Sequence, residues 1–379
     1  MKPTRILPSI ARIFLAACWA VAALPAGGAP PSNRETLQAQ FAQLCDLAKA
    51  KISVETNPGA FFIDSYAIRA LCAAYDVTGN KPYLEVCQAW SDRMVACQDK
   101  MIPRGAYYMN YFRKPGEDKG EWYVADSSSI AMGVLATAVR CQGPERQRYL
   151  DSAKAFAKLV MEDYPGKAGG IRNGAWPKFA GEWWCSSGIF GSFAFLLYDE
   201  TGDERYLKVA LGALEWLNQL DLTQDETIQY YPLSKLGPTK PMYVLEAYSA
   251  GWPHLKPESP RQQAALTQIT WALNWMAEQQ AKPISSRDWP CDRGWGMKFG
   301  GLPFHQYVYS RLLADKEKLS GAADHELEQL ASVLFAKKPE FSQLAVFMMM
   351  SYSERLAPGA IYRNSRGASE KGPAKAAKE

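Results

Sequence analysis

The chain has 379 residues, of which 47% are hydrophobic and 22% are charged, and its formal net charge is +4. This composition is that of a folded globular protein with a large apolar core, so extended disorder is excluded for most of the chain. The Lys and Arg residues form no concentrated basic run, which excludes the electrostatic footprint of a nucleic-acid-binding protein.

The first 29 residues have the three regions of a secretory signal peptide. Lys2, Arg5 and Arg12 precede the apolar run IFLAACWAVAAL, and small residues follow it up to Ala29. This run is shorter than the roughly 20 residues that a membrane-spanning helix needs. We therefore expect a periplasmic or secreted protein, cleaved near Ala29, without stable membrane insertion. The segment LAAC resembles a bacterial lipobox, so lipidation of Cys18 is an alternative, although the apolar run continues past it.

Helix-like blocks follow one another from residue 34 onward, and strand patterns hardly occur. The predicted helices cover residues 34–51, 60–78, 82–98, 124–141, 145–162, 186–200, 204–219, 241–252, 260–281, 304–317, 322–337 and 341–356. The fold class is therefore all-α, in one domain over residues 30–357. The last segment, 358–379, has few apolar residues and is predicted to be a disordered tail.

Short and long connections alternate between these helices. YDVTGNKPYL and YDETGDERYL are short, and their Gly residues end one helix before the next begins, which predicts antiparallel helix pairs. The long connections, 99–123, 163–185, 220–240 and 282–303, would then all lie at the same end of the pairs. A ring fits this alternation. The apolar first helices form its inner wall, the amphipathic second helices form its outer wall, and 34–51 pairs with 341–356 to close it.

This plan resembles the (α/α)6 toroids of the six-hairpin glycosidase-like superfamily, over nearly the whole mature chain. The resemblance implies a carbohydrate-active enzyme, most simply a glycoside hydrolase that cleaves oligosaccharides, including uronate-containing ones, inside the ring. Unsaturated glucuronyl and rhamnogalacturonyl hydrolases share this toroid and use an aspartate of the inner cavity. Their His-Asp-x-Gly-Phe-like segment is absent here, and Asp126 is the nearest analogue in position. A polysaccharide lyase, a sugar epimerase and a non-catalytic saccharide-binding protein remain alternatives.

Candidate catalytic acids lie where the long loops enter inner helices. GEWYVADSSSIAMG at 120–133 is echoed by GEWWCSSGIFG at 181–191, and Asp64 and Asp126 each stand in the first turn of an apolar helix. A protonated carboxyl could donate to a glycosidic oxygen while an ionised one activates water. Each aspartate could instead be a helix cap. Glu182 is a third candidate, with a structural role in the loop as its alternative.

His305 stands at the start of a predicted inner helix and is a candidate proton carrier, on which the epimerase alternative depends. A lone histidine is often only a packing residue. The long loops are also rich in aromatic rings, on which the apolar faces of sugars stack, although some of these rings would attach the loops to the helices. The predicted substrate-binding residues are Trp122, Tyr123, Trp183, Trp184, Trp295 and Tyr107, with Arg172 as a cationic partner.

Cysteine and histidine spacing predicts no metal site and no cofactor. Cleavage near Ala29 leaves seven cysteines, an odd number, so at least one thiol stays free. No C-x-x-C pair occurs and the three histidines are scattered, which is unlike a zinc site. Cys185 follows Trp184 but has no neighbouring His or Asn to activate it, so we expect it to be buried or in a disulfide.

Overall fold

The computed structural model describes residues 34–52, 61–107, 122–174, 181–220, 239–284 and 301–362. The chain divides into two units, Met1–Pro31 and Ser32–Glu379, and every described residue belongs to the second unit. The predicted signal peptide, Cys18 and Trp295 lie outside the described residues.

The second unit is built from α-helices, as its sequence predicts. The described residues form α1 (Arg34–Ile52), α2 (Phe61–Thr78), α3 (Lys81–Gln98), α4 (Val124–Ala138), α5 (Gly143–Asp163), α6 (Trp184–Thr201), α7 (Glu204–Asn218), α8 (Thr239–Gly251), α9 (Pro260–Gln280), α10 (Gly301–Leu312), α11 (Lys316–Leu334) and α12 (Gln343–Leu356), with a short 3-10 helix η3 (Trp252–His254). Within the described ranges β-structure is limited to three isolated bridges. The all-α prediction is therefore confirmed.

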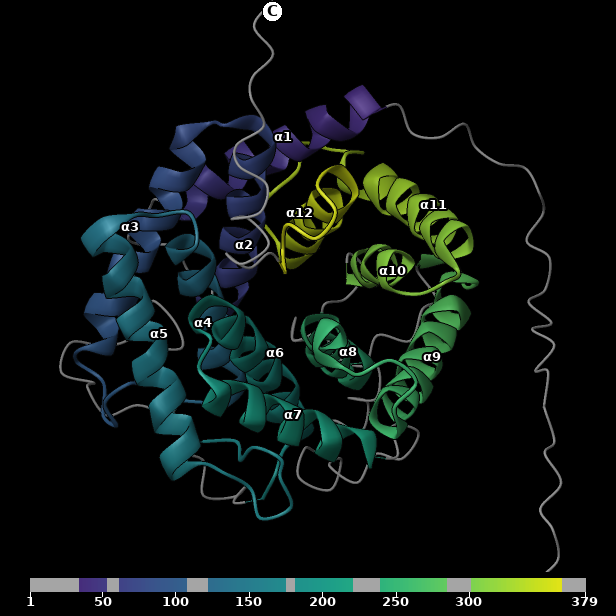
Figure 1. Ribbon diagram of the computed structural model, residues 1–379. Coiled ribbons are helices and arrows are strands. Elements are labelled where there is room, and N and C mark those ends of the chain that lie inside the picture. The colour runs from purple at the N-terminus through teal and green to yellow at the C-terminus, as the bar shows by residue number, and fades with distance from the viewer. Residues whose placement is uncertain are drawn as a thin grey trace, which may run out of the picture. The chain divides into compact units, whose positions relative to one another are not determined.

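The helices of this unit form a closed ring with two walls (Figure 1). Successive even-numbered helices pack against one another from α2 to α12, and α12 packs back against α2. Each odd-numbered helix lies outside and packs against an inner one, including α1 against α12. The ring therefore has six helical hairpins, the last of which joins the beginning of the folded chain to its end, as predicted.

Burial patterns explain which helix lies in which wall. In α4 and α6 nearly every residue is buried, because neighbours cover these helices on all sides. The outer helix α7 buries only one stripe, Tyr206, Ala210, Ala213, Leu214 and Leu217. Small residues allow close approach between inner helices, since an added Cβ at Gly133 on α4 would lie 3.2 Å from the Cβ of Ser65 on α2.

The short turns repeat one hydrogen-bonding pattern. Gly79 and Gly202 both have positive φ, 68° and 71°, and end α2 and α6. The amide of Gly79 donates to the carbonyl of Tyr75 at 2.8 Å, and that of Gly202 donates to Tyr198 at 2.7 Å. Because both hairpins turn in the same way, the opposite ends of the inner helices come together at the other end of the ring.

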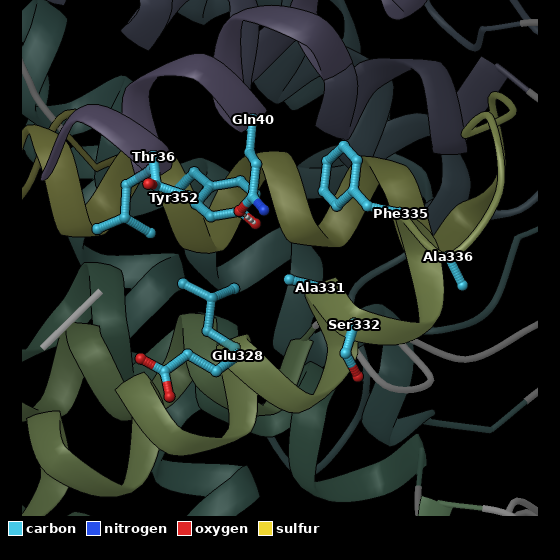
Figure 2. A pocket seen from close by; sticks show the side chains of 10 residues that line it. Thr36, Gln40, Glu328, Ala331, Ser332, Phe335, Ala336 and Tyr352 are labelled. Carbon is cyan, nitrogen blue, oxygen red and sulfur yellow. Dashed lines mark hydrogen bonds between the residues drawn. The ribbon is translucent and has the colours of Figure 1, made fainter. Parts of the chain in front are cut away.

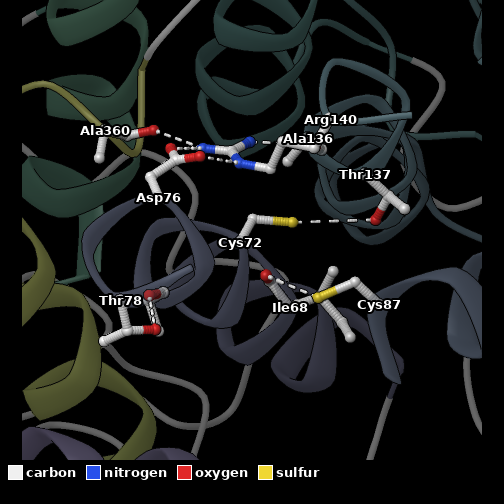
Figure 3. Close-up of polar contacts among 10 residues, drawn as sticks. Ile68, Cys72, Asp76, Thr78, Cys87, Ala136, Thr137, Arg140 and Ala360 are labelled. Atoms are coloured by element: carbon white, nitrogen blue, oxygen red, sulfur yellow. Dashed lines mark hydrogen bonds and ion pairs between the residues drawn. The ribbon is translucent and has the colours of Figure 1, made fainter. Parts of the chain in front are cut away.

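The end of the ring that carries the short turns is fastened by the C-terminal segment, residues 357–362. Arg140 forms two hydrogen bonds with Asp76, at 3.1 and 2.6 Å, and also donates to the carbonyl of Ala360 at 3.4 Å (Figure 3). Ala360 and Ile361 are each only 4% exposed. The folded chain therefore extends to Tyr362, beyond the predicted domain end at residue 357.

Candidate active site

Residues 165–174 connect the starts of two inner helices. The carbonyl of Asn173 accepts from the amide of Val124 at 2.9 Å, and that of Ile171 accepts from Trp183 at 2.9 Å. Bridges also pair Tyr123 with Gly174 and Arg172 with Glu182. The two echoed Gly-Glu-Trp segments thus lead into α4 and α6 on either side of one extended segment.

Asp126 is the third residue of α4, and its carboxyl does not cap the helix. Tyr123 occupies the N-cap position, without a side-chain capping bond. Within the described part of the chain, Asp126 makes no hydrogen bond or ion pair and is partly exposed. Burial among its neighbours raises the pKa of Asp126 to about 7, and no neighbouring charge contributes to this rise. A partly exposed carboxyl that holds its proton near neutral pH can serve as a general acid.

Asp126 faces the interior of the ring. Ser129, three residues later on the same face of α4, lies against the hydroxyl of Tyr66 on α2. Cys185, at the start of α6, is also close, because burial and then the charge of Asp126 raise the pKa of its thiol. Asp126 therefore lies among residues of α2, α4 and α6.

Asp64 occupies a different position from the one that its place in the repeat suggested. It is fully buried, and on α2 it precedes Tyr66 by two residues and Arg69 by five. Arg69 faces the interior of the ring, where it forms an ion pair with Glu246 on α8, and Tyr66 lies against it. At about 100° per residue, Asp64 lies about 160° around the helix from Tyr66 and about 140° from Arg69. Asp64 and Asp126 therefore do not share the interior face, and Asp64 is a poor candidate for the second catalytic carboxylate.

Glu182 supports the loop that connects the two helix starts. Its Oε1 accepts a hydrogen bond from the amide of Ala168. Its side chain also lies over Gly170, where an added Cβ would come within 2.8 Å of the Glu182 Cγ. These contacts favour a structural role for Glu182, in which it holds the loop through backbone amides.

His305 lies deep inside the ring on α10. It is fully buried, and within the described residues neither ring nitrogen has a hydrogen-bond partner. Burial, and then the charge of Arg69, lowers the pKa of His305 to about 3. The imidazole is therefore neutral at physiological pH and offers one donor and one acceptor.

The predicted substrate-binding aromatic residues are mostly buried. Trp122 is fully buried and packs edge-on against Tyr164 with 4.9 Å between ring centroids. Trp183 and Trp184 are 8% and 5% exposed and stack on one another. Among the predicted aromatic residues that the structure describes, Tyr123 alone keeps intermediate exposure, at the N-cap of α4.

Tyr107 and Arg172 are already bound to other parts of the protein. The hydroxyl of Tyr107 is hydrogen-bonded to Ser152 on the outer helix α5 at 2.7 Å. Arg172 donates to the carbonyl of Asp163 and lies over the ring of Tyr164. In this arrangement both side chains stabilise the loops, and their role in binding substrate stays a prediction.

Sequence patterns missed a charged cluster inside the ring. Arg69 on α2 and Glu246 on α8 form an ion pair at 3.5 Å, and each is at most 1% exposed. The ring of Tyr362 lies over Arg69, and its hydroxyl donates to Glu246 at 2.5 Å. A charged residue in the middle of an inner helix, with uncharged neighbours on both sides, was the available signal, but nothing in the sequence pairs these positions.

Six of the cysteines are described, and all are free thiols: Cys45, Cys72, Cys87, Cys97, Cys141 and Cys185. Cys291 lies outside the described residues. In the part of the chain that the structure describes, no group of three or more His, Cys, Asp or Glu is arranged to hold a metal ion. Over the same ranges no helix has both the length and the apolar character to cross a membrane.

A surface groove of about 290 Å³ lies on the outside of the ring, between α1, α11 and α12 (Figure 2). Its lining includes Leu37, Ala331 and Phe335, with Gln40 accepting a hydrogen bond from Tyr352 at 2.7 Å. Glu328 is its one carboxylate. The groove therefore lacks the acid and base pair that hydrolysis of a glycoside requires.

The ring of six hairpins defines an (α/α)6 toroid. Solved structures agree on the fold. An inactive variant of an α-1,6-mannanase from a Salegentibacter species, in complex with α-1,6-mannotriose, is 13% identical with a TM-score of 0.59, covering 84% of this chain and 99% of that one. A family 76 mannosidase from Bacteroides thetaiotaomicron is 11% identical with a TM-score of 0.56, covering 86% and 98%. Cellobiose 2-epimerase from Bacillus thermoamylovorans is 12% identical with a TM-score of 0.57, covering 85% and 100%.

The family is defined by the sequence itself. Residues 48–238, half of the chain, match the family model described as Glycosyl hydrolase family 76, and the chain belongs to this family. No curated protein matches significantly. The protein is thus a glycoside hydrolase of the six-hairpin superfamily that acts on oligosaccharides. Its family differs from the unsaturated glucuronyl and rhamnogalacturonyl hydrolases that the resemblance of the repeat plan implied.

Proposed function

We propose that this protein hydrolyses α-mannoside oligosaccharides inside the ring, with Asp126 as the general acid. Membership of family 76 supports the reaction class, and similarity to a mannanase bound to α-1,6-mannotriose supports the sugar. The observation that carries the residue assignment is the carboxyl of Asp126, which is partly exposed, makes no hydrogen bond within the described chain, and has a pKa of about 7.

In this mechanism Asp126 protonates the oxygen of the leaving sugar. A pKa of about 7 keeps a large share of the carboxyl protonated at neutral pH, whereas an ordinary aspartate would be ionised. Loss of such a proton donor typically lowers the rate by about 10²- to 10⁴-fold. Above pH 7 the protonated fraction falls, so the rate should fall as well.

This chain lacks the pair of consecutive aspartates that the similar mannanase contains. The inactive variant of that enzyme carries asparagine at two consecutive aspartates. This chain has no two consecutive aspartates, and Ala125 and Ser127 flank Asp126. Hydrolysis also needs a group that activates water or attacks the sugar. In this proposal that group is not a sequence neighbour of Asp126, and the full burial of Asp64 does not support it in this role.

The test is to incubate purified protein with α-1,6-mannotriose and follow products by mass spectrometry. Hydrolysis adds one water across the cleaved bond, and Asp126→Asn should lower kcat by about 10²- to 10⁴-fold. Asp203→Asn, at an exposed N-cap between α6 and α7, is the matched control and should keep full activity. Cleavage without water would indicate a lyase, unchanged mass with altered chromatography an epimerase, and binding without any product a saccharide-binding protein.

We also propose that the protein is exported. The support is the order of basic, apolar and small residues in the first 29 positions. N-terminal sequencing of protein from a native host should find a start near Pro30. Mature protein that retains Met1 would contradict this proposal.

A further inference from the structure

The ion pair between Arg69 and Glu246 spans the interior of the ring. Arg69 belongs to α2, which packs against α4 and α12, whereas Glu246 belongs to α8, which packs against α6 and α10. Their contact at 3.5 Å therefore joins two inner helices that are not neighbours in the wall. Of the remaining cluster residues, His305 belongs to α10, and it lies close enough to Arg69 for the charge of Arg69 to lower its pKa. Four separate elements thus converge here, when Tyr362 from the C-terminal segment is included.

Many polar atoms of this cluster are buried without a hydrogen bond of normal geometry. Within the described chain they include all three guanidinium nitrogens of Arg69, Oε1 of Glu246 and both ring nitrogens of His305. A buried polar group that lacks a partner costs about 1–3 kcal/mol, so a concentration of such groups needs an explanation. Donors and acceptors occur together, since Arg69 only donates and Glu246 only accepts.

A second buried ion pair in the same ring shows what a purely structural pair looks like. Arg140 binds both oxygens of Asp76 and also the carbonyls of Ala136 and Ala360, so each of its terminal nitrogens has a partner (Figure 3). Arg69 instead contacts one oxygen of Glu246 at 3.5 Å and lies between the rings of Tyr66 and Tyr362. The interior pair therefore has fewer hydrogen bonds than the structural pair: the hydroxyl of Tyr362 donates to Glu246, whereas Oε1 of Glu246 has no partner within the described residues.

We infer that Arg69, Glu246 and His305 form a binding site for the hydroxyl groups of a neutral sugar ring. A sugar hydroxyl both donates and accepts, so neighbouring hydroxyls can accept from Arg69 and donate to Glu246 at the same time. A neutral imidazole adds one donor and one acceptor. The inference deepens the proposed function, because it rests on a sugar as the ligand.

The net charge of the cluster favours a neutral sugar over an acidic one as its ligand. The cation of Arg69 is already matched by the anion of Glu246, and His305 is neutral, so the cluster has no surplus positive charge. A uronate would place a second carboxylate beside Glu246 in a buried environment, which like-charge repulsion disfavours. The site therefore selects neutral hexoses, in contrast to the uronate-containing substrates expected from the resemblance.

The decisive variant is His305→Phe, measured in the full chain carrying Asp126→Asn to slow hydrolysis, by calorimetric titration with α-1,6-mannotriose, maltotriose and cellotriose. His305 makes no hydrogen bond within the described protein, so an apolar ring of similar shape should leave the unfolding temperature unchanged or raise it. If the nitrogens bind a sugar, the dissociation constant of the trisaccharide that binds best should rise about 5- to 20-fold. The double variant Arg69→Met with Glu246→Leu removes both charges together and should weaken binding about 100-fold.

His254→Phe is the matched control, because His254 lies in η3, stacks on Phe195 and contacts Asp199 at 3.1 Å. It should lose stability and keep its affinity for sugar. Wild-type affinity in both cluster variants would overturn the inference, as would the absence of binding to all three neutral trisaccharides or tighter binding of a mannuronate-containing analogue. Product formation is measured separately, so a protein that binds through this cluster without hydrolysis would contradict the proposed function alone.

Discussion

The starts of α4 and α6 have nearly the same backbone and different chemistry. Their N-cap residues, Tyr123 and Trp183, have φ of −125° and −129° and ψ of 140° and 130°. In the first turn the amide of Ser127 donates to Tyr123 at 3.0 Å, and that of Ser187 donates to Trp183 at 2.9 Å. In this register Asp126 corresponds to a serine, Ser186.

The side chains at these equivalent positions have different partners. The hydroxyl of Ser186 donates to Asn173 at 3.2 Å and so helps to fix the connecting segment. Asp126 contributes no such bond within the described chain. Of these two equivalent positions, Ser186 therefore stabilises the fold. Asp126 holds a carboxyl that makes no such structural bond and is available to a substrate.

The largest effect on kcat should come from a substitution that makes the first turn of α4 resemble that of α6. Asp126→Ser removes the only carboxyl in the first turn of α4 and should lower kcat by about 10²- to 10⁴-fold. Ser186→Ala should change kcat by less than about 5-fold, because it removes only a structural hydrogen bond. Steady-state rates on α-1,6-mannotriose provide the measurement. Equal losses in the two variants would mean that Asp126 is also structural.

The segment shared by both helix starts should be the most sensitive to backbone strain. Gly174 has φ of 112°, and an added Cβ would lie 2.9 Å from the carbonyl oxygen of Trp122. We expect Gly174→Ala to lower the free energy of unfolding by about 2–4 kcal/mol, measured by urea denaturation. Gly181→Ala is the control, since an added Cβ there has nothing within 4 Å, and its effect should stay within about 0.5 kcal/mol.

Ionisation of Asp126 should make stability depend on pH. Its folded pKa of about 7 exceeds the unfolded value of about 3.9, so the folded state holds the proton longer and stability falls as pH rises from about 4 to 7. Asp126→Asn, which cannot ionise, should be more stable than the wild type at pH 8 by about 2 kcal/mol, after allowance for partial exposure. Below pH 4 the two should be equally stable. Urea denaturation at both pH values measures the difference.

Asp203 provides a control of opposite sign for this pH dependence. Hydrogen bonds from Arg205 lower the pKa of Asp203 to about 2. Its contribution to stability is therefore present above pH 4 and lost below it, and Asp203→Asn should be less stable than the wild type at pH 8. If both variants shift stability in the same direction, the raised pKa of Asp126 is wrong.

The ring could be predicted because its turns have distinctive chemistry. Gly79 and Gly202 occupy positions with positive φ, so the sequence itself separates the paired helices. The boundary between α10 and α11 was less accurate. The prediction ended one helix at residue 317 and began the next at 322, whereas they meet between Leu312 and Lys316. Gly321 lies inside α11, with nothing within 4 Å of an added Cβ, and a helix tolerates such a glycine at small cost.

Residues of the candidate site could be predicted only where they lie in the repeated sequence segments. Asp126 was found because its segment is echoed, but the echo aligns Trp122 with Trp183, one residue away from the structural register. Asp64 could not be placed from the sequence, because the sequence does not say which side of α2 faces the interior. The ion pair between Arg69 and Glu246 across the ring identifies that side. Tyr362 was assigned to a disordered tail, since a short segment with few apolar residues gives no local sign of the tertiary contacts that order it.

The smallest effect should come from Glu182, the acid of the second echoed segment. Its Oε1 accepts from the amide of Ala168, and glutamine offers the same oxygen without the charge. Glu182→Gln should therefore cost at most about 1 kcal/mol of stability and change kcat by less than about 5-fold. Thermal unfolding and initial rates measure both quantities. A loss of kcat as large as that of Asp126→Ser, with stability unchanged, would instead make Glu182 a catalytic residue, because only its proton or charge would have been removed.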